Sequence, residues 1–210
     1  MDGRSGDCPD AARRCGTGSC RCTERFSRLN RGAGIGGADH LGGQRRRRGR
    51  KGIADGGIST NRVLTGGFGQ SALARFDRDV LDQPGVLTVI VLEGINDINT
   101  GSTADELIAG YRNLLRRAHA DNNTCIVGGT LTPDEGGNAD REAQRQAVNE
   151  FVRTSGEFDG VVDFDAAVRY PGNPSDFLPA CDSGDGLHPS DAGYQAMASA
   201  VPLGLLDCGR

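Results

Sequence analysis

His188 lies in a loop with the residue types of a general acid–base site. The loop reads Asp185-Gly186-Leu187-His188-Pro189 and precedes the last predicted helix. An aspartate three residues before a histidine can curl back and accept the imidazole Nδ1–H, which leaves Nε2 free as a general base. The alternative is a surface histidine beside an aspartate that caps a helix. His119 falls inside a predicted helix and His40 in an atypical N-terminal segment, so His188 is the candidate base.

A second loop presents an amide at the end of a predicted strand. Residues 86–92 are a β-branched apolar run that continues into Glu93-Gly94-Ile95-Asn96-Asp97. Gly94 permits unusual backbone angles, and the Asn96 amide could then stabilise a developing oxyanion without titrating. Alternatively, Asn96-Asp97 forms an Asx turn that caps the next segment. The residues alone leave both interpretations open.

The elements that position these loops alternate between helix and strand after residue 53. Helices are predicted over 70–81, 103–119, 138–155 and 191–200, and strands over 86–92, 124–130 and 160–164. The run 86–92 is expected to be buried on both faces. In helix 138–155, we expect Ala143, Ala147, Phe151 and Val152 to face inward.

This alternation, with short connections, predicts an α/β fold. We expect a three-layer α/β/α sandwich with a mainly parallel, doubly wound (flavodoxin-like) sheet. In such sheets the chemistry lies at the carboxyl ends of the strands. The loop after residues 86–92 is therefore a place where a site is expected.

Residues 1–52 differ in composition from the remainder. They carry 13 Lys+Arg against 5 Asp+Glu, whereas residues 53–210 carry 11 against 23. They show no apolar period of 2 or 3.6. We therefore expect residues 1–52 to be an atypical, poorly ordered basic Gly/Arg/Cys-rich segment and residues 53–210 to be the folded domain. A frame shift or misread start in a GC-rich gene would also produce such a segment.

The motifs of this basic segment do not define a site. The G-x-G-x-x-G at 32–37 lacks a preceding strand, and Cys8, Cys15, Cys20 and Cys22 lack the paired spacing of a zinc site. We expect no metal and no cofactor. Arg45–Lys51 could contact nucleic acid, but the acidic remainder argues against that partner. No run is long enough to span a membrane, and no signal peptide is visible.

Together these motifs resemble a known family. Gly94-x-Asn96-Asp97, followed later by Asp185-x-x-His188-Pro189, is similar to the third and fifth sequence blocks of the SGNH hydrolases (GDSL-type esterases and lipases). Residues 57–64 are similar to the second block, and the resemblance runs from about residue 53 to 206. It implies a carboxylic ester hydrolase that transfers acyl groups to water by Ser–His–Asp chemistry, on small-molecule, carbohydrate or lipid esters. The alternative is a catalytically inactive α/β domain that binds carbohydrate or acyl groups.

The resemblance assigns roles to individual residues. It implies that His188 is the base, that Asp185 orients it, and that the Asn96 amide is one oxyanion donor. A second donor would be a backbone N–H of the second block, where the family's usual glycine aligns with Thr60 and Gly57 is the fallback. An N–H survives a change from glycine to threonine, but the backbone angles favour glycine.

The nucleophile is not recognisable. The family places its serine in a Gly-Asp-Ser turn after the first strand, whereas this chain has Gly6-Asp7-Cys8 after five residues that cannot form an apolar strand. Cys8 is a weak candidate because a thiolate can attack an ester, and Ser19 and Ser59 are weaker ones. We therefore expect a missing or degraded first strand and impaired hydrolysis.

The resemblance also implies secretion. Longer phrases such as HisProSerAspAlaGlyTyrGlnAlaMetAla, from residue 188 on, look like a secreted esterase branch of the family. In an exported protein Cys181 and Cys208 could pair, while Cys125 is expected to be a buried thiol. The oligomeric state is not indicated.

Overall fold

The computed structural model describes residues 52–120 and 124–207 of the chain. The fold below is that of the compact unit to which the described residues from Gly57 onward belong. Residues 1–51 of the basic segment, where we expect a missing or degraded first strand, lie outside the described residues, as do Cys8, Ser19 and Cys208, so the expectations about them stay predictions.

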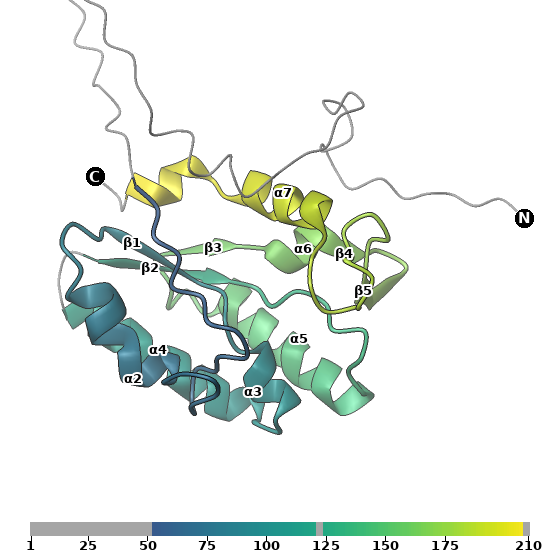
Figure 1. Cartoon of the computed structure of the whole chain (residues 1–210), viewed down its shortest axis with the longest axis horizontal. Coiled ribbons are helices and arrows are strands. Elements are labelled where there is room, and N and C mark those ends of the chain that lie inside the picture. Colours follow the sequence, from purple (N-terminus) through teal and green to yellow (C-terminus); the bar gives the residue numbers. More distant parts are fainter. Residues whose placement is uncertain (1–51, 121–123, 208–210) are drawn as a thin grey trace, which may run out of the picture. The chain divides into compact units, whose positions relative to one another are not determined.

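Three parallel strands form the central sheet. They are β1 (Thr88–Val91), β2 (Cys125–Gly129) and β3 (Gly160–Val162), in the order β1-β2-β3. Successive side chains of a strand point to opposite faces, and in β2 Ile126 joins one apolar cluster while Val127 joins another. Helices cover both faces of the sheet (Figure 1). The prediction of an α/β sandwich with a parallel sheet is confirmed.

One face of the sheet is covered by three helices that the sequence predicted. They are α2 (Ala72–Phe76), which continues into the π-helical turn η2 (Asp77–Leu81), α4 (Ala104–Ala120) and α5 (Ala139–Thr154). Thr103 begins α4 with a capping box, because its Oγ1 accepts from Glu106 N and its own N–H donates to Glu106 Oε2. The inner face of α4 buries Leu107, Tyr111 and Leu114.

The opposite face carries elements of which only the last long helix was predicted. That helix is α7 (Asp191–Ala200), and Ser190 caps it by accepting a hydrogen bond from Gly193 N. The others are α6 (Phe164–Val168), the antiparallel pair β4 (Arg169–Tyr170) and β5 (Asn173–Phe177), and the 3-10 helix η3 (Leu203–Asp207). None of the helices in the described ranges has the length and apolarity to cross a bilayer.

The prediction that β1 is buried on both faces is wrong. Ile90 and Leu92 are 37% and 39% exposed, and within the described residues β1 pairs with β2 alone. The helices pack against the side that carries Val89 and Val91. An apolar run does not indicate how many neighbouring strands a strand has.

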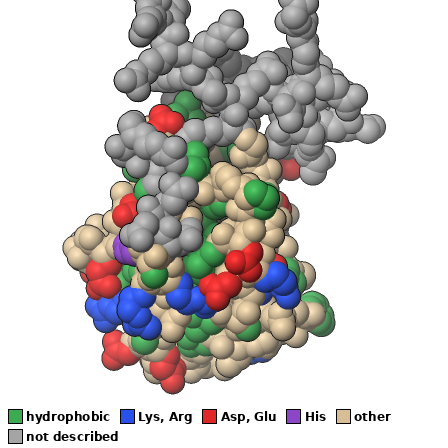
Figure 2. Space-filling model, turned by 90° about the vertical axis from the view of Figure 1, so that its left-hand side faces the viewer, with side chains coloured by type: hydrophobic (Ala, Val, Ile, Leu, Met, Phe, Trp, Pro, Cys, Tyr) green, Lys and Arg blue, Asp and Glu red, His purple; other side chains and the backbone are tan. Residues whose placement is uncertain are grey.

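Apolar side chains also reach the surface among charged ones on the face shown in Figure 2.

The predicted inward face of α5 is wrong in part. Ala143 and Ala147 are exposed. The buried residues of this helix are Arg145, Val148, Asn149 and Val152. Arg145 Nη1 lies 2.7 Å from Asp165 Oδ1, and Asn149 donates to and accepts from the Leu131 backbone. Buried polar groups are tolerated when they are paired, so α5 turns a polar face inward that an apolar pattern cannot reveal.

The bonding of two cysteines differs in part from what the sequence predicted. Cys125 and Cys181 are each disulfide-bonded. The expectation of a free thiol at Cys125 is therefore wrong, whereas Cys208, the expected partner of Cys181, lies outside the described residues.

Candidate active site

The loop after β1 is a short helix, α3 (Ile95–Asn99), that was not predicted. Gly94 precedes it with φ = 139°, and a Cβ at this position would lie 2.7 Å from the Leu107 side chain and 2.8 Å from the Tyr111 hydroxyl. Only glycine therefore suits both this backbone angle and the close approach of α4. The Tyr111 hydroxyl donates to Glu93 O at 2.5 Å, which holds the end of β1 in place.

Asp97 joins the third sequence block to the second. Its side chain is fully buried, with Oδ2 accepting from Val63 N at 2.8 Å and Oδ1 from Leu64 N at 2.9 Å. Burial raises the pKa of Asp97, and the backbone donors oppose that rise only in part. The sequence motif contains Asp97, but its contact with residues more than thirty positions away required the structure.

Replacing Asp97 with alanine is expected to lower the free energy of unfolding by about 2–5 kcal/mol, because two backbone N–H groups lose their buried acceptor. Urea denaturation measures this loss. Asp77→Ala is the matched control, since Asp77 is an exposed partner of Arg117 and a surface pair contributes less than about 1 kcal/mol. Equal losses in the two variants would contradict the role given to Asp97.

The Asn96 side chain contacts the backbone of the residue that follows Thr60. Asn96 Nδ2 donates to Asn61 O at 3.0 Å, and Thr60 precedes Asn61 with φ = 55°. Left-handed angles are uncommon for a β-branched residue, so Thr60 holds the conformation that favours glycine. Gly57 lies three residues earlier and is exposed. The Asn96 side chain bonds the second block rather than capping α3, which disfavours the Asx-turn interpretation.

Asp185 and His188 form a hydrogen-bonded pair. Asp185 Oδ2 lies 2.7 Å from His188 Nδ1, while Oδ1 accepts from the backbone N–H groups of His188 and Leu187 at 2.8 and 3.0 Å. The donors from His188 and Leu187 lower the pKa of Asp185, so its carboxyl is ionised at neutral pH. An ionised Asp185 holds the proton on Nδ1, which leaves Nε2 as an acceptor. Both side chains are exposed.

The loop of this pair is attached to the carboxyl end of β2. Glu135, in the segment that follows β2, donates its N–H to Gly186 O at 2.8 Å. Asn96 follows β1, which is parallel to β2, so both loops belong to the same edge of the sheet. The described hydrogen bonds hold Asn96 to the second block and His188 to Asp185, and none of them joins Asn96 to His188.

His188 Nε2 has no hydrogen-bond partner among the described residues. Ser183 Oγ donates to Asp185 Oδ1 rather than to the imidazole, and Ser59 lies in a turn next to Thr60. The structure thus pairs His188 with Asp185, whereas no described hydroxyl or thiol is bonded to His188 Nε2.

Glu93 is an acidic group of this edge that the sequence analysis did not single out. Its Oε1 is buried and has no hydrogen-bond partner among the described residues, and its Oε2 lies 3.6 Å from Arg75 Nη2. Burial raises the pKa of Glu93, Arg75 opposes the rise, and Asp97 adds to it. Its position between an apolar strand and Gly94 is the only sequence signal that could have indicated it.

Glu93→Gln is expected to stabilise the fold at pH 7 by about 1 kcal/mol, because a neutral amide avoids burying a charge. A pKa raised by folding means that ionisation opposes folding. The contribution of Glu93 to stability should therefore be greatest below the ordinary glutamate pKa and be lost as pH rises through the folded-state value, so the stability of the variant relative to the wild type should increase over that range. Urea unfolding at several pH values tests this.

Glu157→Gln is the control for that measurement. Arg112 lowers the pKa of Glu157, so this carboxylate stabilises the fold above the ordinary glutamate pKa, and its replacement should act in the opposite direction. The same pH dependence in both variants would overturn the assignment to Glu93.

Comparison with known proteins first defines a class, the α/β enzymes that hydrolyse ester bonds. The profile of the GDSL-like Lipase/Acylhydrolase family matches residues 18–196, and the chain belongs to this family. The match begins at residue 18, whereas the resemblance of the sequence motifs begins at about residue 53. No curated protein sequence matches the chain.

Solved structures show the same fold at low sequence identity. A GDSL-like lipase from Bacteroides thetaiotaomicron superposes with a TM-score of 0.54 at 19% identity, over 64% of this chain and 69% of that one. A Bacteroides fragilis protein described as an acylhydrolase gives 0.54 at 21%, over 66% and 69%. A G-D-S-L family protein from Desulfitobacterium hafniense gives 0.51 at 22%, over 61% and 70%. At these identities the likeness establishes the fold.

Proposed function

We propose that this ester hydrolase acts by Ser–His–Asp acyl transfer to water, with His188 as the general base and Asp185 as its orienter. The observation that carries the proposal is the 2.7 Å contact between Asp185 Oδ2 and His188 Nδ1. Backbone N–H groups hold the other oxygen of Asp185, so the carboxylate cannot turn away from the imidazole without losing them. The substrates would be small-molecule, carbohydrate or lipid esters.

In each half of the proposed reaction His188 Nε2 acts first as a base and then as an acid. The nucleophile gives its proton to Nε2 while its oxygen (or sulfur, for Cys8) bonds to the ester carbonyl carbon, whose oxygen becomes negative. As the carbonyl re-forms, the bond to the alcohol oxygen breaks and Nε2 returns the proton to the leaving alcohol. Water then repeats both steps on the acyl-enzyme. Asp185 stays ionised and stabilises the imidazolium.

Asn96 suits the negative oxygen of that intermediate. A primary amide has two N–H donors, of which Asn61 O takes one, leaving the other for a ligand. We propose the backbone N–H of Thr60, or of Gly57, as the second donor. Fixed neutral donors of this kind stabilise charge as it develops.

We further propose that hydrolysis by this chain is impaired. Two observations support this proposal: no described hydroxyl or thiol is bonded to His188, and β1, with Ile90 exposed, has a single described neighbour. We also propose export, since Cys125 and Cys181 are disulfide-bonded and such bonds persist in oxidising compartments.

The test is labelling of the purified chain with a fluorophosphonate probe, followed by peptide mass spectrometry. Labelling of one serine that disappears in His188→Ala would show a working hydrolase and identify its nucleophile, and would overturn the impairment. A parallel maleimide sample reports on Cys8. No label on a chain that melts cooperatively would support the impairment.

A further inference from the structure

Cys125 lies at the amino edge of the sheet, where the parallel strands begin. It is the first residue of β2 and is disulfide-bonded. Its backbone N–H donates to Leu87 O at 2.9 Å, and Thr88, the first residue of β1, is its partner in the register. The cysteine that is bonded to Cys125 therefore comes close to this end of β1 and β2.

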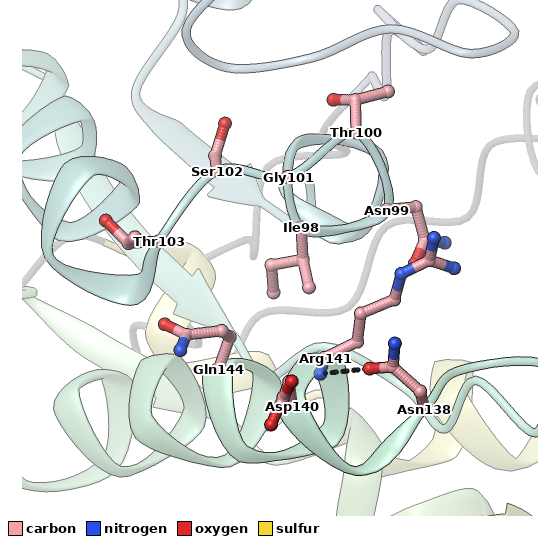
Figure 3. A pocket seen from close by; sticks show the side chains of 10 residues that line it. All are labelled: Ile98, Asn99, Thr100, Gly101, Ser102, Thr103, Asn138, Asp140, Arg141 and Gln144. Atoms are coloured by element: carbon pink, nitrogen blue, oxygen red, sulfur yellow. Dashed lines mark hydrogen bonds between the residues drawn. The ribbon is translucent and has the colours of Figure 1, made fainter.

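The amino edge is at the opposite end of the sheet from the candidate active site. Asn96 follows β1, and the loop of His188 is attached after β2. A pocket of about 460 Å³ is lined by the end of α3, the loop that follows it and the first turns of α5 (Figure 3), and none of its described lining residues is a cysteine. The disulfide of Cys125 is thus separate from the catalytic roles proposed above, and its test does not depend on turnover.

The 3-10 helix η3 brings the C-terminal part of the chain to the amino edge. Thr88 Oγ1 donates to Leu206 O at 3.3 Å. A Cβ at Gly160, the first residue of β3, would lie 2.6 Å from the Leu205 side chain. Since β2 lies between β1 and β3, η3 contacts the strands on both sides of the strand that Cys125 begins.

The Cys125 side chain points to the face of the sheet that η3 covers. Residues two apart in a strand share a face, so Cys125 and Val127 point the same way, and Val127 belongs to the apolar cluster against which Leu205 packs. Cys208 is two residues beyond Leu206, a reach of about 7 Å. The Cα atoms of a disulfide lie about 4.4–6.8 Å apart, so Cys208 can reach Cys125 from the position that η3 holds.

Cys181 belongs to the other edge of the sheet. Its carbonyl oxygen accepts from Ser190 N at 2.7 Å, two residues after His188, and the loop of His188 is attached to the carboxyl edge through Glu135. The four residue steps of β2 separate the two edges by about 13 Å. This is about twice the longest Cα separation of an ordinary disulfide, which excludes Cys181 as the partner of Cys125.

We propose that Cys125 pairs with Cys208 and that this disulfide fastens the C-terminal end of the chain to the amino edge of the sheet. As the S–S bond forms, each thiol loses one proton and one electron, and an external disulfide takes up both protons and both electrons and becomes two thiols. Reduction by a dithiol reverses the step and releases Cys208 from β2. This pairing replaces the expected bond between Cys181 and Cys208.

Digestion of the unreduced chain with the protease Asp-N, followed by mass spectrometry, tests the pairing. Free thiols are alkylated first, which prevents exchange. Cleavage before aspartates places Cys125, Cys181 and Cys208 on separate fragments, which are residues 121–133, 176–181 and 207–210. We expect fragment 121–133 to be joined to fragment 207–210 and to separate from it on reduction. An alkylated Cys125, or fragment 121–133 joined to any other cysteine fragment, would overturn the proposal.

Cys208→Ser should free the Cys125 thiol, which is then alkylated in the denatured, unreduced variant. In the matched control Cys22→Ser, Cys125 should stay blocked. The proposed bond closes a loop of about 80 residues, so its loss should lower the melting temperature by roughly 5–15 °C. The double variant Cys125→Ser/Cys208→Ser should melt within about 2 °C of Cys208→Ser, because both lack the same bond. Additive losses from the two single variants would contradict the pairing.

Discussion

His188→Ala is expected to reduce kcat/KM for p-nitrophenyl acetate by about 10²–10⁴-fold relative to the wild type, the range that a positioned general base contributes. Without the imidazole, no group accepts the proton of the nucleophile or returns it to the leaving alcohol. The rate of hydrolysis of this activated ester is measured spectrophotometrically on purified protein, with kcat and KM determined for both proteins.

The chain offers a matched control for that variant. His119 Nε2 lies 3.0 Å from Asp159 Oδ2, so it is a second exposed histidine with an aspartate partner. Asp159 lies directly before β3, at the amino end of this strand, whereas Asp185 and His188 belong to the carboxyl edge. His119→Ala should leave the rate unchanged. Equal losses in both variants would show a general effect of removing a histidine and contradict the role of His188.

The absolute wild-type rate separates the mechanism from the proposed impairment. A low wild-type rate that His188→Ala reduces further means that a nucleophile is present and poorly placed. A wild-type rate equal to that of His188→Ala means that the base has no nucleophile to serve. In the second case the fold and the Asp185–His188 pair persist as structure without turnover.

Local patterns in the sequence predicted those parts of the fold that depend on neighbouring residues. The helices predicted over 191–200 and 103–119 agree with Asp191–Ala200, which Ser190 caps, and with Ala104–Ala120, which buries one face. These features rest on capping chemistry and on a period of 3.6, which a single segment contains. The short elements α3 and α6 hold five residues each, too few for such a period to be recognised.

Features that rest on long-range polar contacts could not be predicted. Ala143 and Ala147 were expected inside because they are apolar, but the buried positions belong to Arg145 and Asn149, whose partners lie on other segments. The same holds for Glu93, whose burial depends on how Arg75 and the end of β1 pack together. A pattern of apolar residues contains no information on which charges find partners.

In the candidate site too, short-range contacts could be predicted from the sequence and long-range contacts could not. The Asp185–His188 contact spans three residues, so spacing alone predicted it, and the 2.7 Å distance agrees. The link from Asn96 to Asn61 spans 35 positions and required the structure. A role for Thr60 also depends on its left-handed backbone, which the residue type does not indicate.

Asn96→Ala should lower kcat by about 10²–10³-fold, the loss that follows removal of one oxyanion donor. The donor acts on the charge of the transition state, so KM should change little. Asn113→Ala is the control, because Asn113 lies on α4 and makes no described side-chain hydrogen bond. Measurements of kcat and KM on both variants check the prediction.

Asn96→Ala also removes the hydrogen bond to Asn61 O, so a fall in kcat could have a structural cause. Measurement of the melting temperature distinguishes this cause from the loss of an oxyanion donor. If Asn96 only fastened the second block, Asn96→Ala would lower the melting temperature and raise KM together, much as Asp97→Ala should loosen the same contact. If it donates to the oxyanion, kcat falls while the melting temperature stays within the small change expected for one hydrogen bond of about 1 kcal/mol. A fall in stability without a fall in kcat would remove Asn96 from the catalytic site.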